Sequence, residues 1–172
     1  MFSPEETANA AKPRFKVTTF LWYWLPVLIW MSVVFSASSD SKSYQHSMAI
    51  FEPLLRWLFP WMSPQTVELC HHLFRKLGHL TEYAVLALLF YRAIRKSAPG
   101  DLRPWRWSEA GLALMLVFAY AASDEFHQVF VPTRTPLVSD VLIDTTGGAA
   151  ALLMLWAGQK LFSRSRLRGA KV

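Results

Sequence analysis

The feature that constrains this chain most is an apolar run near its start, residues 18–36, which contains no charged side chain. At about 1.5 Å per residue, a helix over this run is long enough to cross the hydrocarbon core of a bilayer. Pro26 lies inside the run and is tolerated in lipid, because neighbouring helices can satisfy the freed carbonyl. Basic residues precede the run, as in a secretory signal peptide, but the run is long for one and further apolar runs follow. We therefore predict a retained transmembrane helix.

Three later apolar runs are each short, and they reach membrane length only when extended through their polar neighbours. The extended spans cover residues 73–94, 107–131 and 137–160. Basic side chains gather between and beside the spans: Lys12, Arg14 and Lys16; Arg92, Arg95, Lys96, Arg103 and Arg106; and Lys160, Arg164, Arg166, Arg168 and Lys171. With four spans these three segments share one side, which the positive-inside rule makes cytoplasmic. The sequence thus predicts an all-α, multi-pass integral membrane protein with four transmembrane helices and both termini cytoplasmic.

The composition agrees with a membrane protein. The chain is 53% hydrophobic and only 17% charged, whereas soluble domains average roughly one quarter charged residues. The net charge of +6 follows the topology described above, so we expect no nucleic-acid partner. Cys70 is the single cysteine, which excludes an intrachain disulfide and a cysteine-based zinc site.

The predicted organisation is a cytoplasmic tail (1–17), a membrane domain (18–160) and a basic cytoplasmic tail (161–172). The first external loop covers about residues 37–72 and begins with a Ser-rich, turn-like stretch, residues 38–43. Residues 54–62 are rich in Leu, Trp and Phe around Arg56, which is typical of an aromatic segment in the membrane interface. Ser63 and Pro64 predict the N-cap and first position of a new helix.

Polar residues are concentrated at the predicted outer ends of the last three spans. They are His72, Arg75, Lys76, His79, Glu82 and Tyr83; Asp124, Glu125, His127 and Gln128; and Asp140 and Asp144, with Arg134 in the tight turn between the third and fourth spans. At about 100° per residue, Asp124, His127 and Gln128 share roughly one third of a turn. On the fourth span the acidic face continues into Gly147 and Ala151, and such small residues let helices approach closely. These faces can therefore point at one another in a bundle.

Carboxylates at membrane depth are costly unless they are paired or hydrated, so this group needs an explanation. One interpretation is structural, with interhelical salt bridges such as Arg134 with Asp140 and Glu82 with His127. In the functional interpretation, Asp124, Glu125 and His127 supply acid–base chemistry or hydrogen bonds. The other predicted ligand-binding residues are Lys76, His79, Glu82, Tyr83, Gln128, Arg134, Asp140 and Asp144, with Arg134 and Lys76 suited to a phosphate or carboxylate group.

The chemistry of this group is not fixed by any compact motif. The spacings typical of metalloenzymes, such as H-E-x-x-H, are not found in the sequence, so no metal site is predicted. No nucleophile elbow, phosphate-binding loop or dinucleotide fingerprint is found either. The sequence therefore leaves the cofactor unknown and the reaction, if there is one, unnamed.

Three stretches together resemble the VanZ-like family of bacterial membrane proteins. They are Arg75-Lys76-x-x-His79-x-x-Glu82-Tyr83, then Asp124-Glu125-Phe126-His127-Gln128-x-Phe130-x-Pro132-x-Arg134, then Asp140-Val141-x-x-Asp144-x-x-Gly147. Phe35-Ser36 is also similar to the family's pattern, and the resemblance covers about residues 20–160. One departure is Asp144, where many relatives are expected to carry Asn. The resemblance implies a four-helix membrane fold, a location in the bacterial cytoplasmic (inner) membrane and a role in the cell envelope.

The family's namesake is associated with low-level resistance to teicoplanin, a glycopeptide with a lipid tail. The resemblance therefore implies a teicoplanin-resistance-like role in antibiotic resistance. We expect a polar site that recognises or modifies an amphiphilic envelope component or lipoglycopeptide, with a membrane lipid or lipid-linked envelope molecule as partner. The alternative is a non-enzymatic helper subunit that binds another membrane protein through its small-residue face. Whether the chain is an enzyme stays open.

Overall fold

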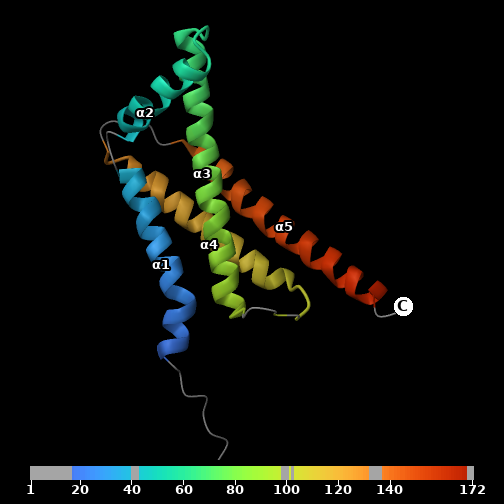
Figure 1. Cartoon of the computed structure of the whole chain (residues 1–172). Helices are drawn as coiled ribbons and strands as arrows, with labels where there is room; N and C mark the ends of the chain where they lie inside the picture. Colours follow the sequence, from blue (N-terminus) through green and yellow to red (C-terminus); the bar gives the residue numbers. More distant parts are fainter. Residues whose placement is uncertain (1–16, 40–42, 98–100, 102, 132–136, 170–172) are drawn as a thin grey trace, which may run out of the picture.

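The computed structural model describes residues 17–39, 43–97, 101, 103–131 and 137–169. Within these residues the chain forms five helices and no strand: α1 (Val17–Ser39), α2 (Ser43–Leu58), α3 (Pro64–Arg95), α4 (Trp107–Gln128) and α5 (Val138–Gly169) (Figure 1). The all-α prediction is therefore confirmed for the described chain. The predicted N-terminal tail and Arg134 lie outside the described residues.

The four predicted spans correspond to α1, α3, α4 and α5, whereas the first loop differs from its prediction. Residues 37–72 are mostly helical, because α1 continues to Ser39, α2 follows and α3 already begins at Pro64. Ser63 caps α3 as predicted, since its hydroxyl accepts a hydrogen bond of 3.2 Å from the backbone N–H of Thr66. Its neighbour Pro64 occupies the first turn, where a missing N–H costs nothing.

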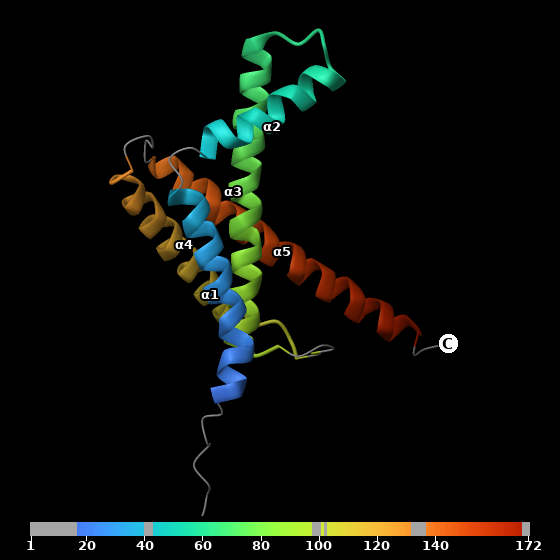
Figure 2. The same cartoon turned by 60° about the vertical axis from the view of Figure 1, so that its left-hand side comes forward.

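The short helix α2 lies across the upper half of α3 (Figures 1 and 2). The ring of Phe51 lies 5.4 Å from the ring of His71 and 5.1 Å from that of Phe74, both centroid to centroid. Packing of Phe51 against these rings explains why the segment is helical and folded back, since a helix this short needs tertiary contacts. Trp57 in the last turn of α2 and Trp61 after it are 77% and 79% exposed, which leaves the predicted aromatic segment at the surface.

The centre of the bundle is the crossing of α3 and α5, which share the largest helix–helix contact. Gly147 of α5 lies directly on the backbone of α3 at Leu80, where an added Cβ would overlap the carbonyl oxygen. Beside it, Gly148 lies against Val117 of α4 and Ala87 of α3. The predicted close approach along this face of α5 is thus observed at Gly147. It determines where along their lengths α3, α4 and α5 meet.

Two of the described helices are long and apolar enough to cross a membrane: Val17–Ser38 within α1 and Val138–Ser163 within α5. α1 packs against both α3 and α4. Trp30 donates its indole N–H to the backbone oxygen of Glu82 at 2.9 Å, and Tyr120 donates its hydroxyl to the backbone oxygen of Met31 at 2.6 Å. These bonds hold the second half of α1 beside the acidic ends of its neighbours.

The opposite end of the bundle is organised by Arg95, which the sequence pattern had placed among the exposed basic residues of a loop. Its side chain is only 2% exposed and forms ion pairs with Asp101 at 3.0 Å and Glu109 at 3.1 Å. It also donates to the backbone oxygen of Pro104 at 3.0 Å and to that of Arg103. The guanidinium thus ties the connection between α3 and α4 to both helices, because its planar donors reach several acceptors at once.

Candidate functional site

The predicted polar residues that come together are Tyr83 of α3, Asp124, Glu125 and Gln128 of α4, and Asp144 of α5. All five are buried: Tyr83 is fully inaccessible, Asp124 and Asp144 are 3% exposed, Gln128 is 6% and Glu125 is 9%. Their burial follows from the fold, since the crossing of α3 and α5 at Gly147 brings these helix faces against one another. Polar faces of three helices therefore meet at these residues.

A hydrogen-bond chain runs through the cluster. Gln128 donates its side-chain amide to the hydroxyl of Ser38 at 2.9 Å and lies 3.5 Å from the nearer carboxylate oxygen of Asp124, Oδ2. Tyr83 donates a long bond of 3.4 Å to the same Asp124 oxygen. Asp124 therefore receives donors from α3 and α4 on one oxygen only, and Gln128 connects it to α1.

Ser38 belongs to the cluster and was missed by the sequence analysis, which placed it in a turn. Val27, Val34 and Ser38 are each 1% exposed and lie at helical spacings of seven and four residues. Once α1 is continued one turn past Ser36, Ser38 falls on the buried stripe of Val27 and Val34. That periodicity was the available signal, but the Ser-rich composition after residue 36 concealed it.

Two carboxylate oxygens in this cluster lack a donor within the described residues. Asp124 Oδ1 and Asp144 Oδ1 are both buried without a hydrogen-bond partner there, and the same holds for His127 Nδ1. A buried acceptor left unsatisfied costs about 1–3 kcal/mol, and more when it is charged. Glu125, Asp140 and Asp124 also lie close enough to Asp144 to repel its charge. The arrangement favours a partner that supplies hydrogen-bond donors or positive charge.

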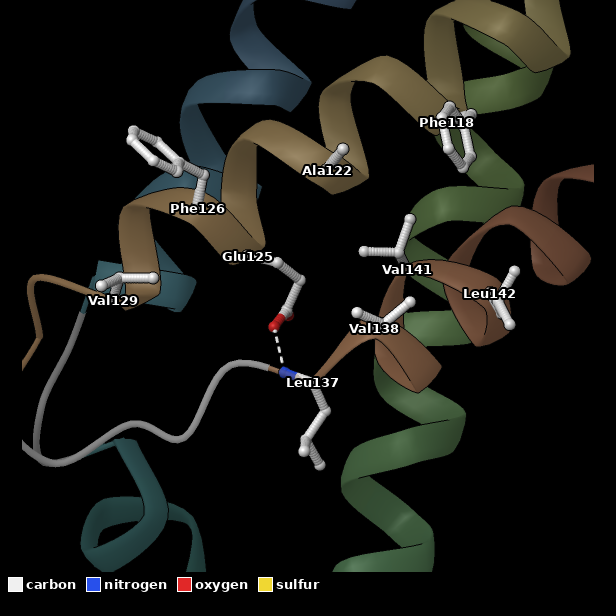
Figure 3. Close-up of a pocket in the computed structure, with 9 residues that line it drawn as sticks. All are labelled: Phe118, Ala122, Glu125, Phe126, Val129, Leu137, Val138, Val141 and Leu142. Atoms are coloured by element: carbon white, nitrogen blue, oxygen red, sulfur yellow. Dashed lines mark hydrogen bonds between the residues drawn. The ribbon is translucent and has the colours of Figure 1, made fainter.

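Glu125 has a different environment from its neighbours because it faces a cleft between α4 and the start of α5. The cleft has a volume of about 350 Å³. Its other walls are apolar: Phe118, Ala122, Phe126, Val129, Leu137, Val138, Val141 and Leu142. The Glu125 side chain reaches from α4 toward the first turn of α5, where Oε2 accepts the backbone N–H of Leu137 at 2.9 Å (Figure 3). This bond satisfies one of the free donors at the beginning of α5.

Other predicted site residues lie around the cluster. His79 and Glu82 pair with each other within α3, with 3.7 Å between His79 Nδ1 and Glu82 Oε2, and both are about one third exposed. Lys76 is exposed and precedes Tyr83 by about 10 Å along the helix axis. Asp140 is half-buried at the first turn of α5. Arg134 lies outside the described residues.

His127 points away from the hydrogen-bond chain toward α1. Its ring packs on that of Phe35, with centroids 4.6 Å apart. His127 is therefore only half-buried, whereas Asp124 and Gln128 are buried. The structural interpretation expected Glu82 to pair with His127, whereas the ion pair formed by Glu82 among the described residues is with His79. The described residues contain no group of three or more side chains placed to hold a metal ion.

The comparison with protein families decides the relationship. The family model described as VanZ/LLP1 matches residues 21–162. The chain belongs to the VanZ/LLP1 family. The matched region includes every residue of the buried cluster and of the cleft beside it. No curated protein and no solved structure matches the chain. The VanZ/LLP1 assignment and the two apolar helices point to a membrane protein of the cell envelope.

Proposed function

We propose that this VanZ/LLP1 chain recognises or modifies an amphiphilic component of the cell envelope, at a polar site near the outer-leaflet ends of its helices. The observation that carries the proposal is the pair of buried acceptors, Asp124 Oδ1 and Asp144 Oδ1, which have no donor among the described residues. Such groups are expensive to retain for stability alone, because apolar residues would hold a bundle equally well. A ligand rich in hydroxyl or amino donors would satisfy them.

The topology in this proposal is a four-span protein of the cytoplasmic membrane with both termini inside. The alternating direction of α1, α3, α4 and α5 supports it, as does the basic character of the connection between α3 and α4 (Figure 1). The cluster then lies at the outer ends of α4 and α5, against the middle of α3, on the side of the membrane where a lipid-linked precursor or a lipoglycopeptide such as teicoplanin presents its head group. Asp124 and Glu125 supply hydrogen bonds or acid–base chemistry there.

The part of the proposal that concerns an anionic group is tested separately. Arg134, four residues from the start of α5, and the exposed Lys76 are the cations assigned to a phosphate or carboxylate of the same amphiphile. Arg134→Ala is expected to weaken head-group binding, with the loss larger at low salt, because screening diminishes a surface charge contact. Binding isotherms at two salt concentrations measure this effect. If affinity and salt dependence both stay unchanged, Arg134 is not part of the site.

The decisive experiment uses Glu125→Gln and Asp124→Asn, which keep the side-chain shape and remove the charge. Membrane abundance, thermal stability in detergent and teicoplanin susceptibility of the host are measured for each variant. The proposal expects normal folding and loss of the phenotype. If stability falls in step with the phenotype, or if neither changes, the carboxylates are structural and the proposal fails.

The alternative is a helper subunit that binds another membrane protein. Its support in the sequence was the small-residue face of α5, but Gly147 and Ala151 are buried inside the bundle and Gly147 lies on α3. That face is therefore engaged within the chain. Co-purification of a stoichiometric protein partner would revive the alternative, whereas a retained lipid-like ligand would favour the proposal.

A further inference from the structure

The cleft between α4 and α5 differs from an ordinary groove on an apolar helix surface. Its rim is open, with Val138 81%, Phe126 67% and Leu142 57% exposed, while Val141 and Glu125 at its floor are 8% and 9% exposed. The space therefore narrows from an apolar entrance to a floor that carries one carboxylate. Figure 3 shows Glu125 on the inner side of the cleft, between the two helices.

A second groove on the molecule provides an internal comparison. It lies between α1 and α3, has a volume of about 490 Å³ and is lined by side chains such as Leu25, Ile29, Val85 and Leu89, with no charged residue in its wall. A groove of this kind offers any hydrocarbon the same contacts and gives no orientation to a head group. The α4–α5 cleft is smaller, yet its single polar group adjoins the buried cluster of Asp124 and Asp144.

The volume of the cleft limits what can fill it. Ligand pockets in proteins measure about 300–1,000 Å³, so a cleft of about 350 Å³ is at the small end of that range. It suits one alkyl chain and is too small for the paired chains and head group of a phospholipid. The charge of the floor is equally selective, because Glu125, Asp124 and Asp144 are all acidic and would repel a phosphate placed directly against them.

We propose that the α4–α5 cleft holds the single alkyl chain of a membrane amphiphile whose head group presents hydroxyl groups, and no phosphate, directly to Glu125. The inference rests on the proposed function, which it extends from the head group to the chain. The amphiphile enters sideways over Val138 and Phe126, the exposed rim residues. Hydroxyl donors of the head group then reach the Glu125 carboxylate and the unsatisfied oxygens of Asp124 and Asp144 behind it, while burial of the alkyl chain supplies most of the affinity.

The experiment compares two photoreactive probes on the full chain in phosphatidylcholine nanodiscs. Both carry a dodecyl chain with a diazirine, one on a maltoside head and the other on a phosphate head. After photolysis, peptide mapping finds the labelled residues, and excess unlabelled dodecyl maltoside defines the saturable part. The proposal expects saturable maltoside labelling between residues 118 and 142, with clearly less from the phosphate probe.

Ala122→Trp fills the cleft and is expected to reduce saturable maltoside labelling by roughly tenfold, because chain methylenes lose their buried contacts. Val138→Trp, at the exposed rim, is a second variant with little effect on packing and covers the entrance instead. Leu25→Trp fills the α1–α3 groove and is the matched control, which should leave labelling unchanged. Thermal stability in detergent shows that each variant is folded.

The outcomes separate this inference from the proposed function. If both cleft variants fold and label like the unmodified protein, or if saturable labelling maps to the α1–α3 groove, the cleft does not bind the alkyl chain. Asp124→Asn tests the head group independently. If the maltoside preference over phosphate depends on Asp124 while labelling lies elsewhere, the proposed function stands and the cleft inference alone is overturned. If the cleft is labelled but shows no Asp124-dependent preference for maltoside over phosphate, the cleft still binds the alkyl chain. Recognition of the head group by the acidic cluster is then overturned.

Discussion

At the scale of single residues, the cluster is defined by acidic groups that face each other, two of which, Asp124 and Asp144, each have one oxygen without a donor among the described residues. Asp144 is the clearest case, because it is only 3% exposed and its Oδ1 has no hydrogen-bond partner among the described residues. The carboxylates of Glu125, Asp140 and Asp124 also repel a negative charge at this position. The sequence resemblance led us to expect Asn at this position in many relatives. An amide has the same shape, carries no charge and adds donors for neighbouring carboxylates, so it would fit this site at lower cost.

Asp144→Asn is therefore expected to keep the fold and to raise the free energy of unfolding by about 1 kcal/mol, because it removes an uncompensated buried charge. Thermal unfolding in detergent measures this change. Asp140→Asn is the matched control and should have little effect, since Asp140 is only half-buried at the helix start. A marked loss of stability in Asp144→Asn would instead indicate a positive partner for this carboxylate.

At the scale of helices, the position of the site depends on how closely α5 approaches α3. Gly147→Ala would place a methyl group against the backbone of Leu80, which cannot move aside as a side chain can. We expect it to destabilise the chain by about 1–3 kcal/mol, the usual cost of overpacking. Gly158→Ala on the same helix has no atom within 4 Å of the added methyl group, so it should be neutral or slightly stabilising. Equal effects of the two substitutions in thermal unfolding would contradict the close approach.

The connection between α3 and α4 predicts an acid-sensitive element. Hydrogen bonds from Arg103 and then from Arg95 hold the pKa of the Asp101 carboxyl well below its usual range. Because the pKa is lower in the folded state, Asp101 stabilises the fold above the unfolded pKa of about 3.9, and this contribution disappears as pH falls below it. The difference in melting temperature between the unmodified chain and Asp101→Asn should be largest at neutral pH and shrink below about pH 4. A difference independent of pH would show that Asp101 acts through shape alone.

The helices show what the sequence could and could not predict. Apolar runs placed α1, α3, α4 and α5, and periodicity placed Asp124 and Gln128 on one buried face, because both depend on local spacing alone. Arg95 was read as one more loop cation, although its burial arises from acceptors on α4 and in the connection. Periodicity identifies residues that share a face, but not the neighbour that the face meets. Arg95 was missed for this reason, whereas Ser38 was missed because the Ser-rich composition around it concealed the last turn of α1.

At the scale of the whole molecule, the two ends of the bundle differ in chemistry. One end carries α2 and the exposed Trp57 and Trp61, and the other carries the connection that Arg95 and Arg103 organise. Figures 1 and 2 place α2 and this connection at opposite ends of α3. Tryptophans are expected at both interfaces, and Trp105 and Trp107 do lie beside the connection, but arginines gathered at one end are the distribution that the positive-inside rule expects of a chain oriented in a bilayer. This asymmetry supports the proposed topology, and it can be tested without knowing the ligand.

The topology predicts which ends of α3 and α4 a membrane-impermeant thiol reagent can reach. Gln65→Cys, at the start of α3, and Ser108→Cys, at the start of α4, are exposed positions at opposite ends of the bundle. In a Cys70→Ser background, intact spheroplasts should label Gln65→Cys alone, and permeabilised ones should label both. Because Arg95 ties α3 to α4 and to the connection beside Ser108, the two positions report on a pair of helices that are held together rather than on separate tails. Labelling of Ser108→Cys but not Gln65→Cys in intact spheroplasts would reverse the orientation and move the acidic cluster to the cytoplasmic leaflet. An envelope amphiphile of the outer leaflet would then be out of reach.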